Sequence, residues 1–305
     1  MGRGMAGDTP ARRRPRKILI SLLRVILGVY LGTLVLLFVF DDRLIFPAPD
    51  QVPALTPAVA GLAYEDLYIP VDEITKIHAW WIPASEPTSK VMLYFHGNAY
   101  SLESEAEQEA PLFHRLAVNL LLVDYRGYGK SSPVHANGPR TEADARAAFR
   151  YLVEQRRVVP SDIVIAGWSI GSAVATQLAV ESPNAAGLIL KSPISSVNDA
   201  ADELWFMRYL FRPVRWFGSK NDFDSRARIS TVHIPVLILS GTADEIAQAW
   251  MPQAIYDCAK EPKTLHMFEG VGDNDFLMSR DGALERFLQT FIANSILRPA
   301  ADARM

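Results

Sequence analysis

Cysteine is nearly absent from this sequence: its 305 residues include one, Cys258. A single thiol cannot form a disulfide framework within the chain, and no Cys/His cluster has the spacing of a zinc site. The sequence also has no internal repeat. We therefore expect neither a disulfide scaffold nor a metal site, and we assign the chain no cofactor.

Positive charge is scarce beyond the N-terminus. Residues 1–40 hold seven of the 31 Lys/Arg residues and one of the 34 Asp/Glu residues, so residues 41–305 hold 24 basic and 33 acidic residues, a net charge of −9. An acidic domain without a basic stripe is a poor partner for nucleic acid. We exclude nucleic-acid binding.

One long apolar segment is present. Residues 18–40 (ILISLLRVILGVYLGTLVLLFVF) carry a single charge, Arg24, and are long enough to cross a bilayer as one helix. Six Lys/Arg residues precede the segment, which predicts a cytoplasmic N-terminus and a domain on the opposite side, periplasmic in a cell with two membranes. A cleaved signal peptide is the alternative, although Phe38–Asp42 offers no small-residue cleavage site.

The chain divides into segments of different composition. We expect a basic cytoplasmic N-terminus (1–17), a transmembrane anchor (18–40), a Pro- and Ala-rich linker (41–62), a folded domain (63–297) with an insertion (195–231), and a tail (298–305). The membrane is then a partner through residues 18–40, and the sequence identifies no protein partner.

Short apolar runs alternate with amphipathic segments along the folded domain. The expected strands are 64–71, 77–82, 91–95, 120–124, 163–166, 187–190, 236–239 and 264–268. The expected helices are 102–116, 142–154, 170–181, 248–259 and 282–296. Strands that are apolar on both faces and alternate with helices are typical of an α/β fold, with a mainly parallel sheet covered on both sides. The first two strands are half-polar, which predicts an antiparallel edge.

The insertion at 195–231 is too long and too aromatic for a plain crossover. Its aromatic residues are Trp205, Phe206, Tyr209, Phe211, Trp216 and Phe217. They either form a small helical core of their own, or belong to a cap that lines an apolar substrate pocket over the end of the sheet.

The pattern G-x-S-x-G occurs at Gly167–Gly171. A strand is predicted directly before it and a helix directly after it, which is the context of a nucleophile elbow, a strained turn that presents a serine hydroxyl at the carboxyl edge of the sheet. Ser169 is therefore the candidate nucleophile, and the N-terminus of the following helix favours developing negative charge. The alternative is an ordinary tight turn with Ser169 as an N-cap.

Two further strand ends carry candidate site residues. The loop after strand 91–95 contains Asn98 and Ala99, whose backbone N–H groups, paired with that of Ile170, would form an oxyanion hole. We expect His96 to be a structural hydrogen-bonding residue of the same loop. Asp244 follows strand 236–239, where a triad acid belongs, although a turn or cap aspartate is the alternative.

The segment Asp124–Ser132 contains Gly-Lys-Ser, as phosphate-binding loops do. The P-loop pattern requires a glycine five residues before Gly129, where this chain has Asp124, and Pro133 prevents a helix from starting at Ser131. We therefore interpret this segment as a loop that braces the active-site face.

These motifs together resemble the α/β-hydrolase superfamily, and within it the membrane-anchored abhydrolase-domain proteins related to serine-aminopeptidase-like and thioesterase members. The resemblance covers residues 41–297 and is carried by Arg43–Pro47, Tyr94–Ala99, Asp124–Ser131, Gly167–Gly171, Phe223–Ser225 and Gly241–Asp244. It implies an eight-stranded α/β-hydrolase fold with a small helical cap, preceded by one transmembrane helix, and a serine hydrolase active on small-molecule or acylated substrates.

The sequence departs from this family at one position. The family has its catalytic histidine in the loop after the last strand, where this chain has Asp273. His266 lies seven residues earlier, inside a predicted strand and below the catalytic edge. Asp273 beside Asp244 would form a carboxylate pair that holds a proton, and such a pair is a weak base toward Ser169.

Two functions remain open at this point. The first is a membrane-anchored hydrolase that cleaves an ester, thioester or amide through Ser169, with its activity impaired by Asp273. The second is a catalytically inactive member of the fold that binds a lipid-like ligand or a protein. The intact elbow favours the first function, and the missing histidine favours the second.

Overall fold

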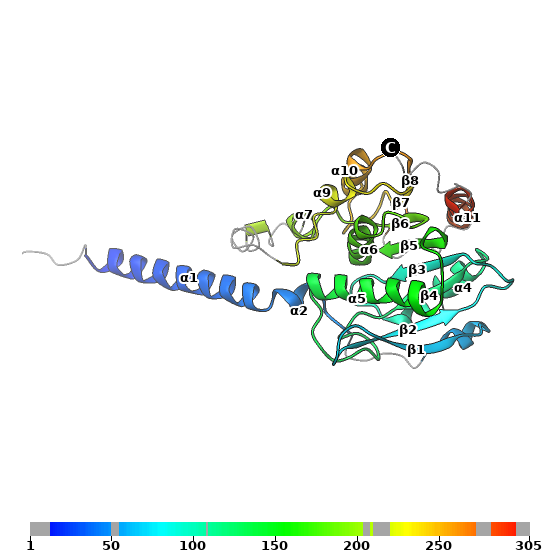
Figure 1. Ribbon diagram of the computed structural model, residues 1–305. Coiled ribbons are helices and arrows are strands. Elements are labelled where there is room, and N and C mark those ends of the chain that lie inside the picture. The colour runs from blue at the N-terminus through cyan, green and yellow to red at the C-terminus, as the bar shows by residue number, and fades with distance from the viewer. Residues whose placement is uncertain are drawn as a thin grey trace, which may run out of the picture.

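The computed structural model describes residues 13–49, 55–107, 109–203, 208–209, 220–272 and 282–296. Helix α1 (Arg13–Val39) projects from the domain as a long rod, and the remaining elements gather around one twisted sheet (Figure 1). Within the described residues, Lys17–Val39 is the one helical segment long and apolar enough to cross a membrane.

The sheet has eight strands in the order β1-β2-β4-β3-β5-β6-β7-β8. Their bounds are β1 (Glu65–Pro70), β2 (Lys76–Ile82), β3 (Val91–Phe95), β4 (Asn119–Val123), β5 (Ile163–Trp168), β6 (Gly187–Lys191), β7 (Val236–Gly241) and β8 (Lys263–Phe268). The pairings β1–β2 and β2–β4 are antiparallel and the other five are parallel. The predicted mainly parallel sheet is confirmed, and so is its antiparallel edge, which β1 and β2 form; β2, between β1 and β4, is nevertheless almost fully buried.

Helices cover both faces of the sheet, as predicted. The helices are α2 (Asp41–Ile45), α3 (Leu102–Glu105), α4 (Glu109–His114), α5 (Gly138–Arg150), α6 (Ile170–Glu181), α7 (Val197–Glu203), α9 (Ser225–Ile229), α10 (Trp250–Cys258) and α11 (Ala283–Ile296). Apolar side chains of α5, α6, α9 and α10 pack on one face, and those of α4 and α11 pack on the other. The two faces therefore hold separate hydrophobic clusters.

Two helices differ from their predicted bounds for local reasons. The helix predicted over 102–116 is split into α3 and α4, because Pro111 has no N–H to continue a helix and is tolerated only near a helix start. Helix α5 begins at Gly138, four residues before the predicted start. Asn137 caps it by accepting a hydrogen bond from the Arg140 N–H at 3.1 Å.

The end of α1 is fastened to the domain through α2, inside the range predicted to be a linker. Ile45 and Phe46 are buried in the domain core. The fully buried Asn221 donates to Asp41 and to Asp42, both at 2.9 Å, and accepts from the Gly138 N–H at 2.7 Å. These contacts join α2, which directly follows α1, to the end of the insertion and the start of α5.

A buried ion pair holds the loop after β4 against α5. Arg126 donates to Asp144 from its backbone N–H at 2.9 Å and from Nη2 at 2.6 Å, and both side chains are buried. Breaking a buried pair by removing one partner leaves an unpaired charge in a low-dielectric environment, which is strongly destabilising.

We expect Asp144→Ala to lower the free energy of unfolding by about 3 kcal/mol, since the buried Arg126 would keep only the exposed Asp72 carboxylate, 4.0 Å away, as a partner. The matched control is Glu181→Ala. It breaks an exposed ion pair with Arg146, which lies on α5 as Asp144 does, and should cost less than about 1 kcal/mol. Denaturant unfolding of the full chain in detergent measures both. Equal losses in the two variants would contradict the importance of the buried pair.

Candidate active site

Ser169 lies at the turn between β5 and α6 and has backbone angles of φ 52° and ψ −120°. A serine with positive φ is strained by about 1–3 kcal/mol and persists only where its surroundings impose the conformation. Its N–H donates to the Lys191 carbonyl at 2.9 Å, and its carbonyl accepts from the Ser172 N–H at 3.0 Å. Ser169 occupies the N-cap position of α6, but its side chain makes no capping hydrogen bond.

The two glycines of the motif are required by close backbone packing. A Cβ on Gly167 would overlap the Gly171 carbonyl oxygen, and a Cβ on Gly171 would overlap the carbonyl oxygens of Phe95 and His96. Strands β3 and β5 are adjacent, with Phe95 opposite Gly167. The elbow is therefore pressed directly against the end of β3, which brings the loop after β3 beside Ser169.

The two residues of that loop predicted to be oxyanion donors, Asn98 and Ala99, differ in their hydrogen bonding. The Ala99 N–H donates to the Asn98 side-chain oxygen at 2.9 Å and is therefore engaged. The Asn98 N–H has no hydrogen-bond partner among the residues that the structure describes. Ile170 is the first residue of α6, whose first-turn N–H groups have no partner within the helix. Of the two predicted loop donors, the geometry favours Asn98 over Ala99.

The loop after β4 braces this arrangement, as predicted. Tyr125 donates its hydroxyl to the His96 carbonyl at 3.1 Å, and the Tyr128 hydroxyl lies 3.5 Å from the Asn98 side-chain oxygen. His96 is buried, with Nδ1 2.8 Å from the Gly97 carbonyl and Nε2 3.4 Å from an Asp124 carboxylate oxygen. His96 is thus a structural residue of the loop.

Asp244 follows β7 and is buried, with an exposed fraction of 4%. Its Oδ1 accepts from the N–H groups of Ile246 at 2.9 Å and Ala247 at 2.8 Å, so one oxygen closes a turn. Its Oδ2 is buried and has no hydrogen-bond partner among the described residues. A buried carboxylate oxygen without a donor is costly, so Oδ2 is the atom where a catalytic partner would bind.

All six histidines of the chain lie within the described residues, and no hydrogen bond or ion pair joins any of them to Asp244 or Ser169 there. The buried His78 and His96 face Asp124, and His266 packs its ring on Phe287 at 4.0 Å. The remaining three are His114 in α4, His135 beside Arg43 and His233 beside Lys260. Asp273 itself lies outside the described residues, as do Trp205, Phe206, Phe211, Trp216 and Phe217 of the insertion.

The sequence analysis missed a buried charge cluster next to the elbow. Lys191, at the end of β6, forms an ion pair with Glu109, and its Nζ lies 4.4 Å from the centre of the Trp168 ring. Burial, with the Glu109 charge as a second cause, holds the pKa of Glu105 well above its usual range. Two signals in the sequence point to this cluster. Lys191 is a lone lysine at the end of the apolar run 187–190, and Glu105 and Glu109 are four residues apart.

One group of described residues has the chemistry of a cation site. His78, Glu103 and Asp124 are buried and offer ligand atoms that all lie within 4.8 Å of one another. Both ring nitrogens of His78 already face carboxylates, Asp66 at 2.5 Å and Asp124 at 3.3 Å. Burial alone would lower the pKa of His78, but the hydrogen bonds and charges of Asp124 and Asp66 outweigh it and raise the pKa. The His78 ring is therefore held between two carboxylates, one of which, Asp124, also lies 3.4 Å from His96 in the loop that carries Asn98.

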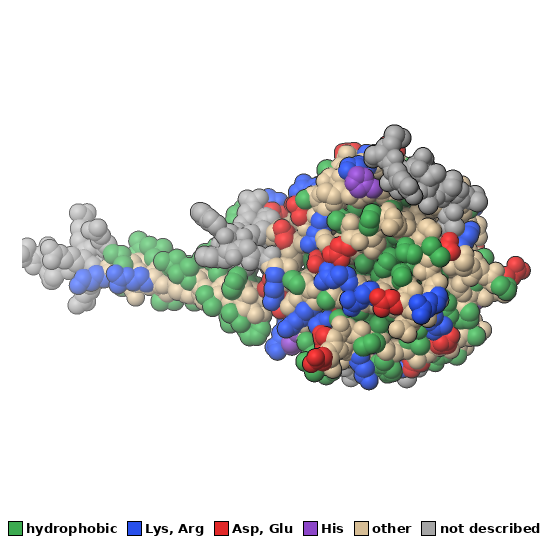
Figure 2. Space-filling model, in the orientation of Figure 1, with side chains coloured by type: hydrophobic (Ala, Val, Ile, Leu, Met, Phe, Trp, Pro, Cys, Tyr) green, Lys and Arg blue, Asp and Glu red, His purple; other side chains and the backbone are tan. Residues whose placement is uncertain are grey.

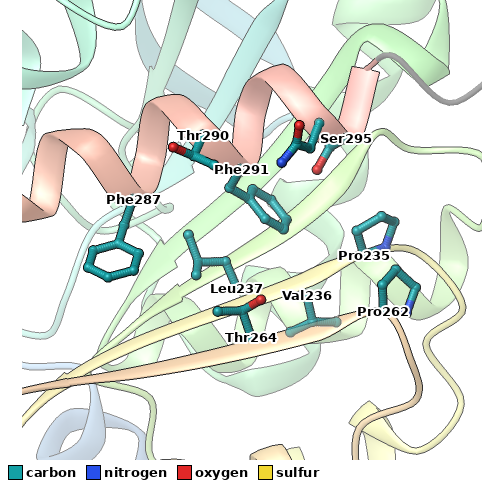
Figure 3. A pocket seen from close by; sticks show the side chains of 10 residues that line it. Pro235, Val236, Leu237, Pro262, Thr264, Phe287, Thr290, Phe291 and Ser295 are labelled. Carbon is teal, nitrogen blue, oxygen red and sulfur yellow. The ribbon is translucent and has the colours of Figure 1, made fainter.

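A groove of about 310 Å³ lies away from this site, between α11 and the strands β7 and β8. Figure 3 shows Phe287 and Phe291 of α11 above Leu237 and Thr264. Its floor includes Pro235 and Val236 at the amino end of β7, whereas Asp244 follows the carboxyl end of that strand. The groove is not part of the candidate active site.

The chain matches the model of the alpha/beta hydrolase family over residues 91–226. It is 35% identical over 245 residues to an uncharacterised protein of Mycobacterium tuberculosis, covering 79% of this chain and 84% of that protein. It is 32% identical over 214 residues to the alpha/beta hydrolase domain-containing protein 17B of Xenopus laevis, covering 69% of each chain. A solved esterase of Pyrococcus furiosus shares the fold, with a TM-score of 0.68 and 17% identity over 82% of this chain and 99% of that one.

The raised pKa of His78 predicts a pH-dependent stability. The folded pKa lies above the ordinary value of 6.5, so the stabilisation is fully present below pH 6.5 and is lost as pH rises through the folded pKa. We expect His78→Gln to unfold at lower denaturant and to lose this pH dependence. The control His233→Gln changes an exposed histidine and should keep the wild-type slope. An unchanged slope in His78→Gln would contradict the assignment.

Proposed function

Because the chain belongs to the alpha/beta hydrolase family, we propose that it is a membrane-anchored serine hydrolase that cleaves an ester, thioester or amide, with Ser169 as the nucleophile. One observation carries the proposal: the backbone of Ser169 is held at φ 52° and ψ −120° at the N-terminus of α6. Holding a serine in this conformation costs free energy that a tight turn with glycine would avoid.

In the proposed reaction, Ser169 Oγ attacks the acyl carbon and gives its proton to a nearby carboxylate. The oxyanion accepts hydrogen bonds from the N–H groups of Ile170 and Asn98, aided by the positive end of the α6 dipole. The bond to the leaving group then breaks, and the leaving group takes the proton. Water hydrolyses the acyl-serine, releases a carboxylic acid and restores the hydroxyl.

The proton acceptor in this scheme is the pair of Asp244 and Asp273. Asp244 Oδ2 has no described donor, and Asp273 occupies the sequence position where the family has its catalytic histidine. A carboxylate is a weaker base than imidazole near neutral pH. Loss of the histidine in a serine hydrolase costs on the order of 10⁶ in turnover, so we propose slow catalysis.

A second candidate function is binding without catalysis. It is favoured by the positions of the six histidines, none of which is hydrogen-bonded to Asp244 or Ser169 among the described residues. In this case, the site would hold a lipid-like ligand or a protein segment without cleaving it.

The membrane anchor is the second part of the proposal. It is supported by the length and apolar character of α1, and by the six basic residues before residue 18. We propose a cytoplasmic N-terminus and a catalytic domain on the opposite side. The segments proposed for this arrangement are the basic N-terminus (1–17), the anchor (18–40) and the hydrolase domain (63–297).

A fluorophosphonate probe tests the nucleophile. We expect the full chain in detergent to be labelled slowly at Ser169, Ser169→Ala to be unlabelled, and Asp273→His to be labelled faster, because an imidazole would restore the base. Mass spectrometry of the labelled peptide identifies the residue. Labelling that appears only in Asp273→His would support the binding function, and labelling in neither would contradict the elbow.

The carboxylate pair makes a separate prediction. Turnover of an activated ester should rise with pH as the pair loses its proton, and Asp273→Asn should abolish the Ser169-dependent part of the rate. Glu269→Gln is the matched control, because it neutralises another carboxylate of the same loop after β8. Unchanged turnover in Asp273→Asn would exclude Asp273 as a base.

A further inference from the structure

The buried group of His78, Glu103 and Asp124 has no part in the proposed reaction, yet its residues come together from three separate elements. His78 is in β2, Glu103 is in α3, and Asp124 directly follows β4. Each residue offers one ligand atom, and the three atoms lie within 4.8 Å of one another. His78 and Asp124 are 46 residues apart along the chain. The group therefore has no local ligand spacing, which explains why the sequence predicts no metal site here.

Glu103 has a buried carboxylate oxygen without a partner. Its exposed fraction is 2%, and its Oε2 has no hydrogen-bond partner among the residues that the structure describes. A buried carboxylate oxygen that lacks a donor is costly, and the nearby carboxylate of Asp124 is also buried, so the two like charges repel each other. One cation between these oxygens would remove both costs.

His78 has the orientation of a metal ligand. Its Nε2 lies 2.5 Å from Asp66 Oδ1, and because an ionised carboxylate can only accept, Nε2 carries a hydrogen. Histidines that bind metals almost always donate their other ring N–H to a carboxylate, a carbonyl or water, which fixes the tautomer and the orientation of the ring. Asp66 provides this bond, and Nδ1, which faces Asp124 Oδ2 at 3.3 Å, is the nitrogen left for a cation. A cation there would replace a proton, so the pH dependence predicted for His78 is that of the metal-free chain.

Asp124 is held in place by the chain around it. Its Oδ1 accepts from the Leu102 N–H at 2.9 Å and faces His96 Nε2 at 3.4 Å, whereas Oδ2 is the oxygen that faces His78. A Cβ on Gly129, where φ is 48°, would overlap Asp124 Oδ2. The glycine therefore allows the carboxylate to lie against the backbone of the loop after β4. The Gly-Lys-Ser segment, which does not fit a phosphate site, thus leaves room for a carboxylate.

Little positive charge opposes the acids of this group. On the face of the domain that Figure 2 shows, acidic and basic side chains are interspersed. Around His78 the balance is different, because three carboxylates lie together, those of Asp66, Glu103 and Asp124. Among the described residues, Lys130 is the one lysine or arginine within ion-pair distance of these acids, with its Nζ 3.8 Å from Asp66 Oδ2. The group therefore carries an excess of negative charge that a divalent cation would neutralise.

The kinds of ligand atom select the kind of cation. Calcium takes about six to eight oxygen ligands, and magnesium keeps most of its water, so neither suits a buried group with an imidazole nitrogen and two carboxylate oxygens. Zinc binds imidazole and carboxylate together, and three protein ligands with one water complete its tetrahedral coordination.

We propose that His78, Glu103 and Asp124 form a zinc-binding site, in which Asp66 orients the His78 ring. The ion connects β2, α3 and the loop after β4, which the protein otherwise joins only through hydrogen bonds and packing. The half-exposed Asp66 side chain lies between the site and the solvent and marks the side from which the ion enters. The inference is independent of the chemistry at Ser169 and of the membrane anchor.

Calorimetric titration with zinc tests the site in the full chain in detergent, after a chelator has removed bound metal. Cys258→Ser is present throughout, because the exposed thiol could bind zinc by itself. We expect one zinc ion per chain. Glu103→Gln keeps the shape of a ligand and removes its charge, so it should weaken zinc binding by more than about 100-fold. Glu107→Gln, which changes an exposed glutamate of the same segment, is the matched control and should bind as tightly as the parent chain.

A second pair of variants tests the orienting carboxylate without touching a ligand. Asp66→Asn should weaken zinc binding by about 10–100-fold, and the chain should tolerate it because the Asp66 side chain is 43% exposed. Glu65→Gln is the matched control, since Glu65 pairs with Arg156 instead. Equal zinc affinity in Asp66→Asn and Glu65→Gln would overturn the role of Asp66, and equal affinity in Glu103→Gln and Glu107→Gln would overturn the site.

X-ray absorption at the zinc edge needs no change to any ligand, so it decides the matter even if a buried variant does not fold. We expect one imidazole nitrogen, with oxygen atoms as the other ligands at about 2.0–2.2 Å. Two or more imidazoles would place the zinc elsewhere and overturn the proposal, as would the absence of stoichiometric binding. Fluorophosphonate labelling of Ser169 reports separately on the hydrolase proposal.

Discussion

The candidate site depends on one close approach of backbone to backbone. Gly171 at the start of α6 leaves no space for a side chain between the elbow and the carbonyl oxygens of Phe95 and His96. This contact fixes the strained conformation of Ser169 and places the loop that carries Asn98 beside it. The loop after β4 then supports the arrangement from behind through Tyr125 and its bond to the His96 carbonyl.

Much of this framework could be predicted because its signals are local. Strands that are apolar on both faces differ from their surroundings, and all eight were placed within two residues of their observed ends. Helix α6 was predicted with its observed bounds, since the glycines of the elbow mark its start. Ser169 and Asp244 each follow a predicted strand of the parallel sheet. That position was sufficient to place both residues at the carboxyl edge.

The remaining features depend on contacts between distant segments, which no local pattern reports. Lys191 pairs with Glu109 across 82 residues of sequence, and Asn221 reaches Asp41 across 180. The half-polar composition of the first two strands correctly suggested an antiparallel edge, where β1 and β2 lie. It did not reveal that the polar His78 of β2 is buried within a network of carboxylates, because a polar residue paired in the interior and a solvated one look alike in the sequence.

The clamp formed by Asn221 has a consequence for where the protein can act. If α1 spans a membrane as proposed, Asp41 and Asp42 lie immediately after the span, and their bonds to Asn221 shorten the free chain between the membrane and the domain. A flexible tether would let the proposed catalytic face sample a range of heights above the bilayer, whereas this attachment would keep it close to the surface. Compounds whose cleavable bond lies near the lipid headgroups would then be within its reach.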